Sequence, residues 1–268
     1  CRRQRQMCIR DSFLSYLFRS TNAVIAPDLV SEFNTNAQQL GILTSSYLFA
    51  FAVFQIPLGI LLDKYGARKV QIFLMIFAGL GSLMFCYGNS ILELTIARAI
   101  IGFGVAGCLM STFKIITVWY NKNNWPILYG LCLSSGGLGA IVATKPLYFI
   151  VDEIGWRSAF FILALLCFLI SLIILIVTPE NENNEEEQNI LFALKEIYSS
   201  KLFWRIAPLA GISGGTALAI QGLWAGEWLR DVARLTQNDA TNMLLILNIS
   251  LLIGCLLYTS DAADDTDS

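Results

Sequence analysis

Two long apolar runs joined by a short charged loop constrain this chain most. The first run covers about 41–62 and ends abruptly in an aspartate and a lysine, and the second begins at about residue 70. A helix that spans a bilayer needs about 20 apolar residues, which both runs approach. The sequence between them, at 59–69, is GILLDKYGARK. The pattern predicts two membrane helices joined by a tight hairpin.

Composition places the rest of the chain in the same class. Of its 268 residues, 56% are hydrophobic and only 14% are charged, whereas soluble domains have about 25% charged residues. A net charge of −2 gives no reason to expect nucleic acid as a partner. The chain has no histidine and no CxxC pair, so we expect no metal and no cofactor. We interpret the cysteines inside apolar runs as packing residues: Cys86, Cys108, Cys132, Cys167 and Cys255.

The two ends of the chain differ from the remainder. Residues 1–12 contain four arginines and no starting methionine, and residues 258–268 are polar, acidic and low in complexity. Both resemble translated adapter or cloning sequence, which is excluded from fold reasoning. We therefore expect an internal fragment that is cut inside one helix at each end.

Eight candidate spans follow one another, at about 13–30, 41–62, 70–87, 91–112, 127–151, 158–177, 206–228 and 242–257. This predicts an all-α membrane protein with a six-helix bundle at 13–178, a cytoplasmic linker at 179–202 and the start of a second bundle at 203–257. The second half of the linker places Ile190, Leu194, Ile197 and Tyr198 at helical spacing. Two interpretations stay open there: a short amphipathic helix on the membrane surface, or one turn leading into the seventh span.

The cations are distributed unequally between the two sides. If the loop at 59–69 is cytoplasmic, its side holds Lys64, Arg68, Lys69, Lys114, Lys122, Lys195, Lys201 and Arg205, and the other side holds Arg157, Arg230 and Arg234. Cytoplasmic loops are enriched in Lys and Arg. The bias predicts a multi-pass protein of the cell (inner) membrane with a cytoplasmic N-terminus.

Two motifs carry a resemblance to a known family. The loop at 59–69 matches G-x-x-x-D-[RK]-x-G-x-[RK]-[RK] at every defined position, and 98–106 carries R-x-x-x-G-x-G-x-A through Arg98, Gly102 and Gly104. Over about 13–257 the chain therefore resembles the major facilitator superfamily, with Ile101 where Gln is usual and Glu227 where bacterial relatives commonly have Pro. The resemblance implies a fold of about twelve helices, present here as six plus about two, and a transporter rather than an enzyme.

In this family, three-helix repeats rock about a site near the middle of the membrane, and the resemblance makes the loop a candidate gate. Asp63 is expected to pair with a cation, or to face a helix N-terminus, in one state only. Gly59 would let a facing helix approach, and Gly66 would make the turn. The alternative is that the cations only anchor the topology: Lys64, Arg68 and Lys69.

Arg19 points most directly to a substrate. Counted from the end of its span, it lies about 16 Å deep, near the middle of a ~30 Å core, where a cation is by default a functional hypothesis. The stretch 16–19, with Pro27 eight residues on, resembles the organophosphate and organic-anion branches, in which an arginine there faces the substrate anion. Lys145 lies about 9 Å inside the outer end of the fifth span. The candidate substrate-binding residues are Arg19, Asn22, Lys145, Gln221 and Trp224.

Other roles stay open for these cations. Arg19 has the alternative of pairing with a carboxylate outside this sequence, and Lys145 that of extending toward the membrane surface. Arg98 either takes part in proton coupling, as the resemblance implies, or bonds main-chain carbonyls of a neighbouring helix.

We expect a monomeric secondary transporter in the lipid bilayer that moves a small anionic or carboxylate-bearing metabolite by alternating access, with a proton or a counter-anion as coupling partner. An amino-acid or dipeptide transporter and a drug/proton antiporter are alternatives. A membrane-embedded enzyme or a sensor fits the sequence less well.

Overall fold

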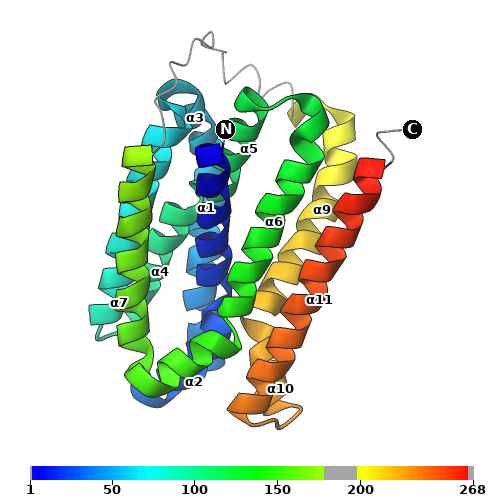
Figure 1. Cartoon of the computed structure of the whole chain (residues 1–268). Coiled ribbons are helices and arrows are strands. Elements are labelled where there is room, and N and C mark those ends of the chain that lie inside the picture. The colour runs from blue at the N-terminus through cyan, green and yellow to red at the C-terminus, as the bar shows by residue number, and fades with distance from the viewer. Residues whose placement is uncertain (1, 178–197, 265–268) are drawn as a thin grey trace.

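The computed structural model describes residues 2–177 and 198–264, and the ordered elements of this part are all helices (Figure 1). Within it, four helices are long and apolar enough to cross a membrane: Ala37–Tyr87, Ile91–Val118, Trp125–Val142 and Lys145–Ile176. Most of the predicted linker at 179–202 lies outside the described residues. The same holds for three of the four apolar positions of the predicted amphipathic helix, Ile190, Leu194 and Ile197.

The first predicted span consists of two helices, α1 (Arg2–Ser20) and α2 (Asn22–Phe33). Thr21 between them keeps helical backbone angles, and both its amide and its hydroxyl donate to the Leu17 carbonyl. Pro27, inside α2, has no N–H to donate to the carbonyl of Ala23. That carbonyl accepts a hydrogen bond from Nη1 of Arg230 instead, at 3.1 Å.

The second and third predicted spans are the two arms of α3 (Ala37–Tyr87). Asn36 caps its start, because the side chains of Asn36 and Gln39 each accept a hydrogen bond from the other's main-chain N–H. Gly66 divides the arms with φ 79° and ψ 154°, a conformation that residues with a Cβ rarely adopt. The predicted turn is therefore present, and the end of the molecule where it lies is called the Gly66 face.

The next spans show two breaks that the sequence did not predict, at Ala106 within the fourth span and at 143–144 within the fifth. They comprise α4 (Ile91–Val105), α5 (Gly107–Trp119), η1 (Lys122–Asn124), α6 (Trp125–Val142) and α7 (Lys145–Val177). The fifth span, expected to be continuous over 127–151, breaks at 143–144, where Pro146 has no N–H to donate to the carbonyl of Val142. Gly155, with φ 79° and ψ 157°, divides α7. The bend in α7 lies at the opposite end of the molecule from the bend in α3 (Figure 1), and this end is called the Gly155 face.

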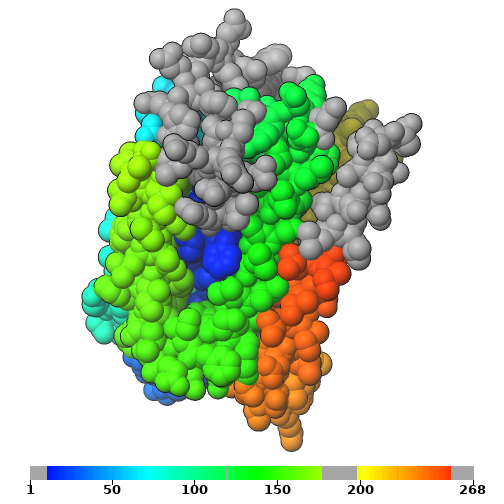
Figure 2. Space-filling view, viewed as in Figure 1, coloured from blue at the N-terminus to red at the C-terminus, as the bar shows by residue number. Residues whose placement is uncertain are grey.

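The last part of the chain forms α9 (Lys201–Ala219), η2 (Ile220–Trp224), α10 (Ala225–Asp231) and α11 (Gln237–Asp264). The seventh and eighth spans are thus longer than the predicted 206–228 and 242–257, and the seventh is interrupted by η2, a π-helix. Helix α11 lies beside α6 (Figures 1 and 2), where a Cβ on Gly137 would come within 2.9 Å of Leu252.

Helices α3 and α4 touch through glycines that the sequence predicted as packing residues. A Cβ added to Gly102 would lie 2.2 Å from the Tyr47 carbonyl oxygen, and one added to Gly104 would lie 2.3 Å from the Ala78 nitrogen. Gly59, in contrast, has nothing within 4 Å of that position, so no described helix approaches it. Four of the cysteines expected to pack in apolar surroundings are buried and free of disulfides: Cys86, Cys108, Cys132 and Cys167.

We expect Gly104→Ala to destabilise the fold by about 1–3 kcal/mol, the usual cost of overpacking, because the new methyl group would overlap main-chain atoms of α3. Gly41→Ala is the matched control, since its nearest neighbour would be Trp224 at 4.0 Å. Thermal unfolding in detergent measures both variants. Equal midpoints for the two would contradict the close α3–α4 contact.

Candidate functional site

Arg98, on α4, is the largest fully buried side chain among the described residues. Its Nη1 donates to the Phe18 carbonyl at 3.1 Å, and its Nη2 donates to Oδ1 of Asn22. Its guanidinium carbon lies 5.0 Å from the ring centre of Phe85 and 5.2 Å from that of Phe160. Of the two roles considered from the sequence, these contacts match the bonding of a neighbouring helix carbonyl.

Asn22, another predicted site residue, extends this arrangement to α3. Its Nδ2 donates to Oγ1 of Thr44 at 2.8 Å, while its oxygen accepts from Arg98. Asn22 therefore connects the first, second and fourth spans, with both ends of its amide occupied.

Arg19 lies one helical turn before Asn22 and is only 7% exposed. Its guanidinium carbon is 4.8 Å from the ring centre of Tyr16 and 5.4 Å from that of Phe51, a cation–π arrangement. Its Nε is buried without a hydrogen-bond partner, and the ion pairs found among the described residues do not include Arg19. The Nε of Arg98 is also buried without a partner, but both terminal nitrogens of Arg98 donate hydrogen bonds to the protein.

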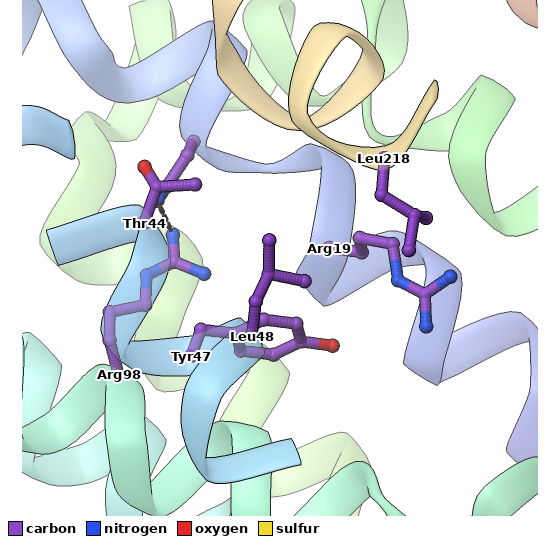
Figure 3. A pocket seen from close by; sticks show the side chains of 7 residues that line it. Arg19, Thr44, Tyr47, Leu48, Arg98 and Leu218 are labelled. Carbon is purple, nitrogen blue, oxygen red and sulfur yellow. Dashed lines mark hydrogen bonds between the residues drawn. The ribbon is translucent and has the colours of Figure 1, made fainter. Parts of the chain in front are cut away.

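Arg19, Asn22 and Arg98 line one cavity, shown in Figure 3. The other lining residues are Thr44, Tyr47, Leu48 and Leu218. The cavity has a volume of about 10 Å³, room for about one water molecule. Its walls come from the first, second and fourth spans and, through Leu218, from α9. It therefore lies between the six-helix bundle and the second bundle.

Sequence reasoning missed Tyr47 in this cavity. Figure 3 shows its hydroxyl on the side of the cavity where Arg19 lies, and Tyr47 is buried. A signal was available, because Thr44, Tyr47, Leu48 and Phe51 follow the i, i+3, i+4, i+7 spacing of one helix face. Two of these residues, Thr44 and Tyr47, carry hydroxyl groups, which indicates that this helix face contacts other helices or a cavity and not only lipid.

Lys145 lies away from the cavity. Its Nζ bonds to Oδ1 of Asn238, near the start of α11, and lies 5.0 and 5.5 Å from the ring centres of Phe149 and Tyr148. The structure does not bring Arg19 and Lys145 together.

Gln221 and Trp224 both belong to the π-helix η2, a type of segment found frequently at functional sites. Nε2 of Gln221 donates to Oδ1 of Asn248 at 2.6 Å, and Trp224 is 46% exposed. Neither residue lines the cavity of Arg19.

The loop at 59–69, which carries the first family motif, contacts other helices of the six-helix bundle. Asp63 forms an ion pair with Lys114 of α5 at 2.8 Å, and Nη2 of Arg68 donates to the Leu175 carbonyl of α7 at 2.6 Å. Lys64 and Lys69 are exposed, with Lys64 5.8 Å from the ring centre of Tyr65. The loop therefore does more than present cations to a membrane surface.

The two bundles also meet at the Gly155 face. There Arg230 donates to the Ala23 carbonyl, and Nε2 of Gln237 donates to the Val24 carbonyl, each at 3.1 Å. Arg230 also forms an ion pair with Glu227 at 2.5 Å. Glu227 stands where the resemblance would place a proline, and α10 continues past it to Asp231.

The long apolar helices and the polar cavity between two bundles define a multi-pass helical membrane protein. The sequence matches the family described as Major Facilitator Superfamily over residues 12–263. The chain therefore belongs to that family, and the predicted fold class is confirmed.

Among curated relatives, the "Probable sulfoacetate transporter SauU" of Cupriavidus necator is 29% identical over 157 residues, 59% of this chain and 36% of its own length. The hexuronate transporter of Escherichia coli is 26% identical over 217 residues, 72% of this chain and 49% of its own length. The chain thus spans between a third and a half of the length of these two relatives.

Solved structures share the fold. A bacterial homologue of the human lysosomal transporter Spinster, in an inward-facing and occupied conformation, has a TM-score of 0.72 and 18% identity, covering 93% of this chain and 59% of its own. The D-xylose–proton symporter has a TM-score of 0.70 and 15% identity, covering 93% and 66%.

We expect Arg98→Gln to destabilise the protein by about 1–3 kcal/mol, because the buried acceptors on Phe18 and Asn22 would lose their charged donor. Arg205→Gln, at an exposed position, is the control. Thermal unfolding in detergent compares the two. A loss no larger than that of the control would rule out a structural role for Arg98.

Proposed function

We propose that this chain is the cation-lined part of a secondary transporter that moves a small anionic metabolite across a membrane by alternating access. The observation that carries the proposal is Arg19: a buried guanidinium with an unsatisfied Nε, beside a cavity between two bundles. A cation in the membrane interior is costly unless it has a partner. A carboxylate, sulfonate or phosphate of a solute would supply that partner and accept charge-assisted hydrogen bonds.

The names of several relatives support an anionic solute. They are described as transporters of sulfoacetate, hexuronate and, with 22% identity in Chlamydia pneumoniae, hexose phosphate. A vacuolar basic amino acid transporter of Saccharomyces cerevisiae is also similar, at 26% identity. Two guanidinium groups around one cavity would repel a cationic solute, so the anionic class is favoured.

The cavity is smaller than any of these solutes, so binding requires the bundles to separate around it. Leu218, its lining residue from the second bundle, would move away from Arg19 as they do. The proposed orientation places the Gly66 face in the cytoplasm, as the excess of cations on that side indicates. The coupling partner is then a proton or a counter-anion, and the protein acts as a monomer in the inner membrane.

We expect proteoliposomes containing the gene product that includes these 268 residues to take up one of sulfoacetate, a hexuronate or a hexose phosphate, and to exclude lysine and neutral hexoses. Arg19→Gln should weaken the affinity for that anion about 30-fold or more, as loss of a buried charged partner does. Radiolabel uptake against concentration gives the half-saturation value of each variant.

Lys145→Gln is the matched control for the site assignment, because it removes a cation that also belongs to a predicted span but lies outside the cavity. Its half-saturation value should stay close to that of the parent. Uptake of none of the anions would contradict the proposed function, and an unchanged affinity in Arg19→Gln would contradict the site.

A further inference from the structure

The turns at Gly66 and Gly155 are alike in sequence as well as in backbone angles. Each glycine has φ 79°, and their ψ values are 154° and 157°. An aspartate stands three residues before each glycine and an arginine two residues after it, giving Asp63 and Arg68 in one turn and Asp152 and Arg157 in the other. The loop that carries the family signature thus has a counterpart at the other face of the bundle.

The likeness extends along both hairpins without a gap, at a constant separation of 89 residues. It relates the second and third spans to the fifth and sixth, as expected of inverted three-helix repeats. Identical pairs include Gly41 and Gly130, Ser45 and Ser134, Ser46 and Ser135, Pro57 and Pro146, Leu58 and Leu147, and Ser82 and Ser171.

The two arginines make reciprocal contacts. Arg68, at the start of the third span, donates to the Leu175 carbonyl near the end of the sixth span at 2.6 Å. Arg157, at the start of the sixth span, donates through Nη2 to the Gly88 carbonyl at the end of the third span, at 3.2 Å. The third and sixth spans are therefore joined at both faces by equivalent arginines, which donate to carbonyls at or near the end of the other span.

Arg157 has a further contact that reaches the first span. Its Nη1 forms an ion pair with Glu32 of α2 at 2.5 Å, and Nε1 of Trp156 donates to the other Glu32 oxygen at 2.9 Å. Helix α2 also holds the carbonyls that accept from the second bundle, those of Ala23 and Val24. Arg157 thus connects the third and sixth spans to the helix that contacts the second bundle at the Gly155 face.

We propose that Arg157 is a positioning residue for transport, the counterpart of the signature arginine Arg68, and that it holds the first, third and sixth spans together as one moving body at the Gly155 face. The proposal rests on the proposed function for its consequence in transport. Rocking of one bundle against the other transmits force to the solute cavity only if the helices of a bundle move together.

A native cysteine reports on this contact independently of transport. Cys86 is 7% exposed and lies with Arg157 in the wall of an open recess of about 490 Å³ at the Gly155 face. In the proposed orientation this recess is on the outside. Loosening of the third span from the sixth would expose the Cys86 thiol to a charged, membrane-impermeant methanethiosulfonate reagent.

The test compares Arg157→Ala and Arg157→Lys with Arg68→Ala in the full gene product, with Cys86→Ser as the labelling blank. In Arg157→Ala, Cys86 should be labelled about tenfold faster and solute uptake should be about tenfold slower. The half-saturation value should be unchanged, because the variant changes the barrier to the movement and not the binding of solute; a tenfold change in rate corresponds to a barrier change of about 1.4 kcal/mol. Arg157→Lys should give intermediate rates of labelling and uptake. Lysine keeps the positive charge but lacks the planar guanidinium, whose two terminal nitrogens contact Glu32 and the Gly88 carbonyl.

Arg68→Ala should slow uptake similarly and leave Cys86 labelling unchanged, because it acts at the other face. Arg234→Gln, an exposed cation on the Gly155 side, should change neither measurement. If Arg157→Ala does not reach the membrane, Glu32→Gln removes the ion pair alone and should raise labelling severalfold.

Labelling and uptake at the parent rates in Arg157→Ala would overturn the proposal, as would slower uptake with unchanged labelling. Faster labelling in a protein that transports none of the tested anions would leave the positioning role supported and the proposed function refuted.

Discussion

Inside a bilayer, a main-chain carbonyl that has lost its helical partner finds no water, so another donor must reach it. Arginine side chains donate to such carbonyls at four points of the bundle, one of them fully buried and three nearer the two faces. They donate to the carbonyls of Phe18, Gly88, Leu175 and Ala23, from Arg98, Arg157, Arg68 and Arg230 respectively. Each bond joins two spans and lies near a helix end, a break or a proline. Because such bonds are charge-assisted, they are about twice as strong as neutral ones, and the packing of the spans depends on them.

Local pattern was enough to predict the parts of the fold that depend on neighbouring residues. The turn at Gly66 follows from a glycine between charged residues at the end of an apolar run, and the structure places it there. The break at 143–144 was also encoded locally, by Pro146, but a proline within an apolar run is compatible with a kinked span as well as with a broken one. Only the packing around it decides between the two.

The candidate site was less predictable, because depth along a helix is only one of the two coordinates of a side chain. Arg19 and Lys145 both have central positions by residue count, yet Arg19 faces the cavity and Lys145 meets Asn238, 93 residues further along the chain. Rotation about the helix axis is set by contacts with other helices. A charge in an apolar run is conspicuous in a sequence, whereas the only sequence signal for Tyr47 is its place on one helix face with Thr44, and the neighbouring spans show that this face lines the cavity.

Pro27 gives the Gly155 face a particular property. Its ring leaves the Ala23 carbonyl without an intrahelical partner, and the donor that replaces it belongs to the other bundle. If the bundles separate at this face, as the proposed transport requires, that oxygen loses its donor and must be hydrated, since Pro27 offers it no N–H within its own helix. In the proposed transport cycle, separation of the bundles at this face therefore requires water to reach that oxygen, and the hydrogen bond from Arg230 stabilises the closed arrangement.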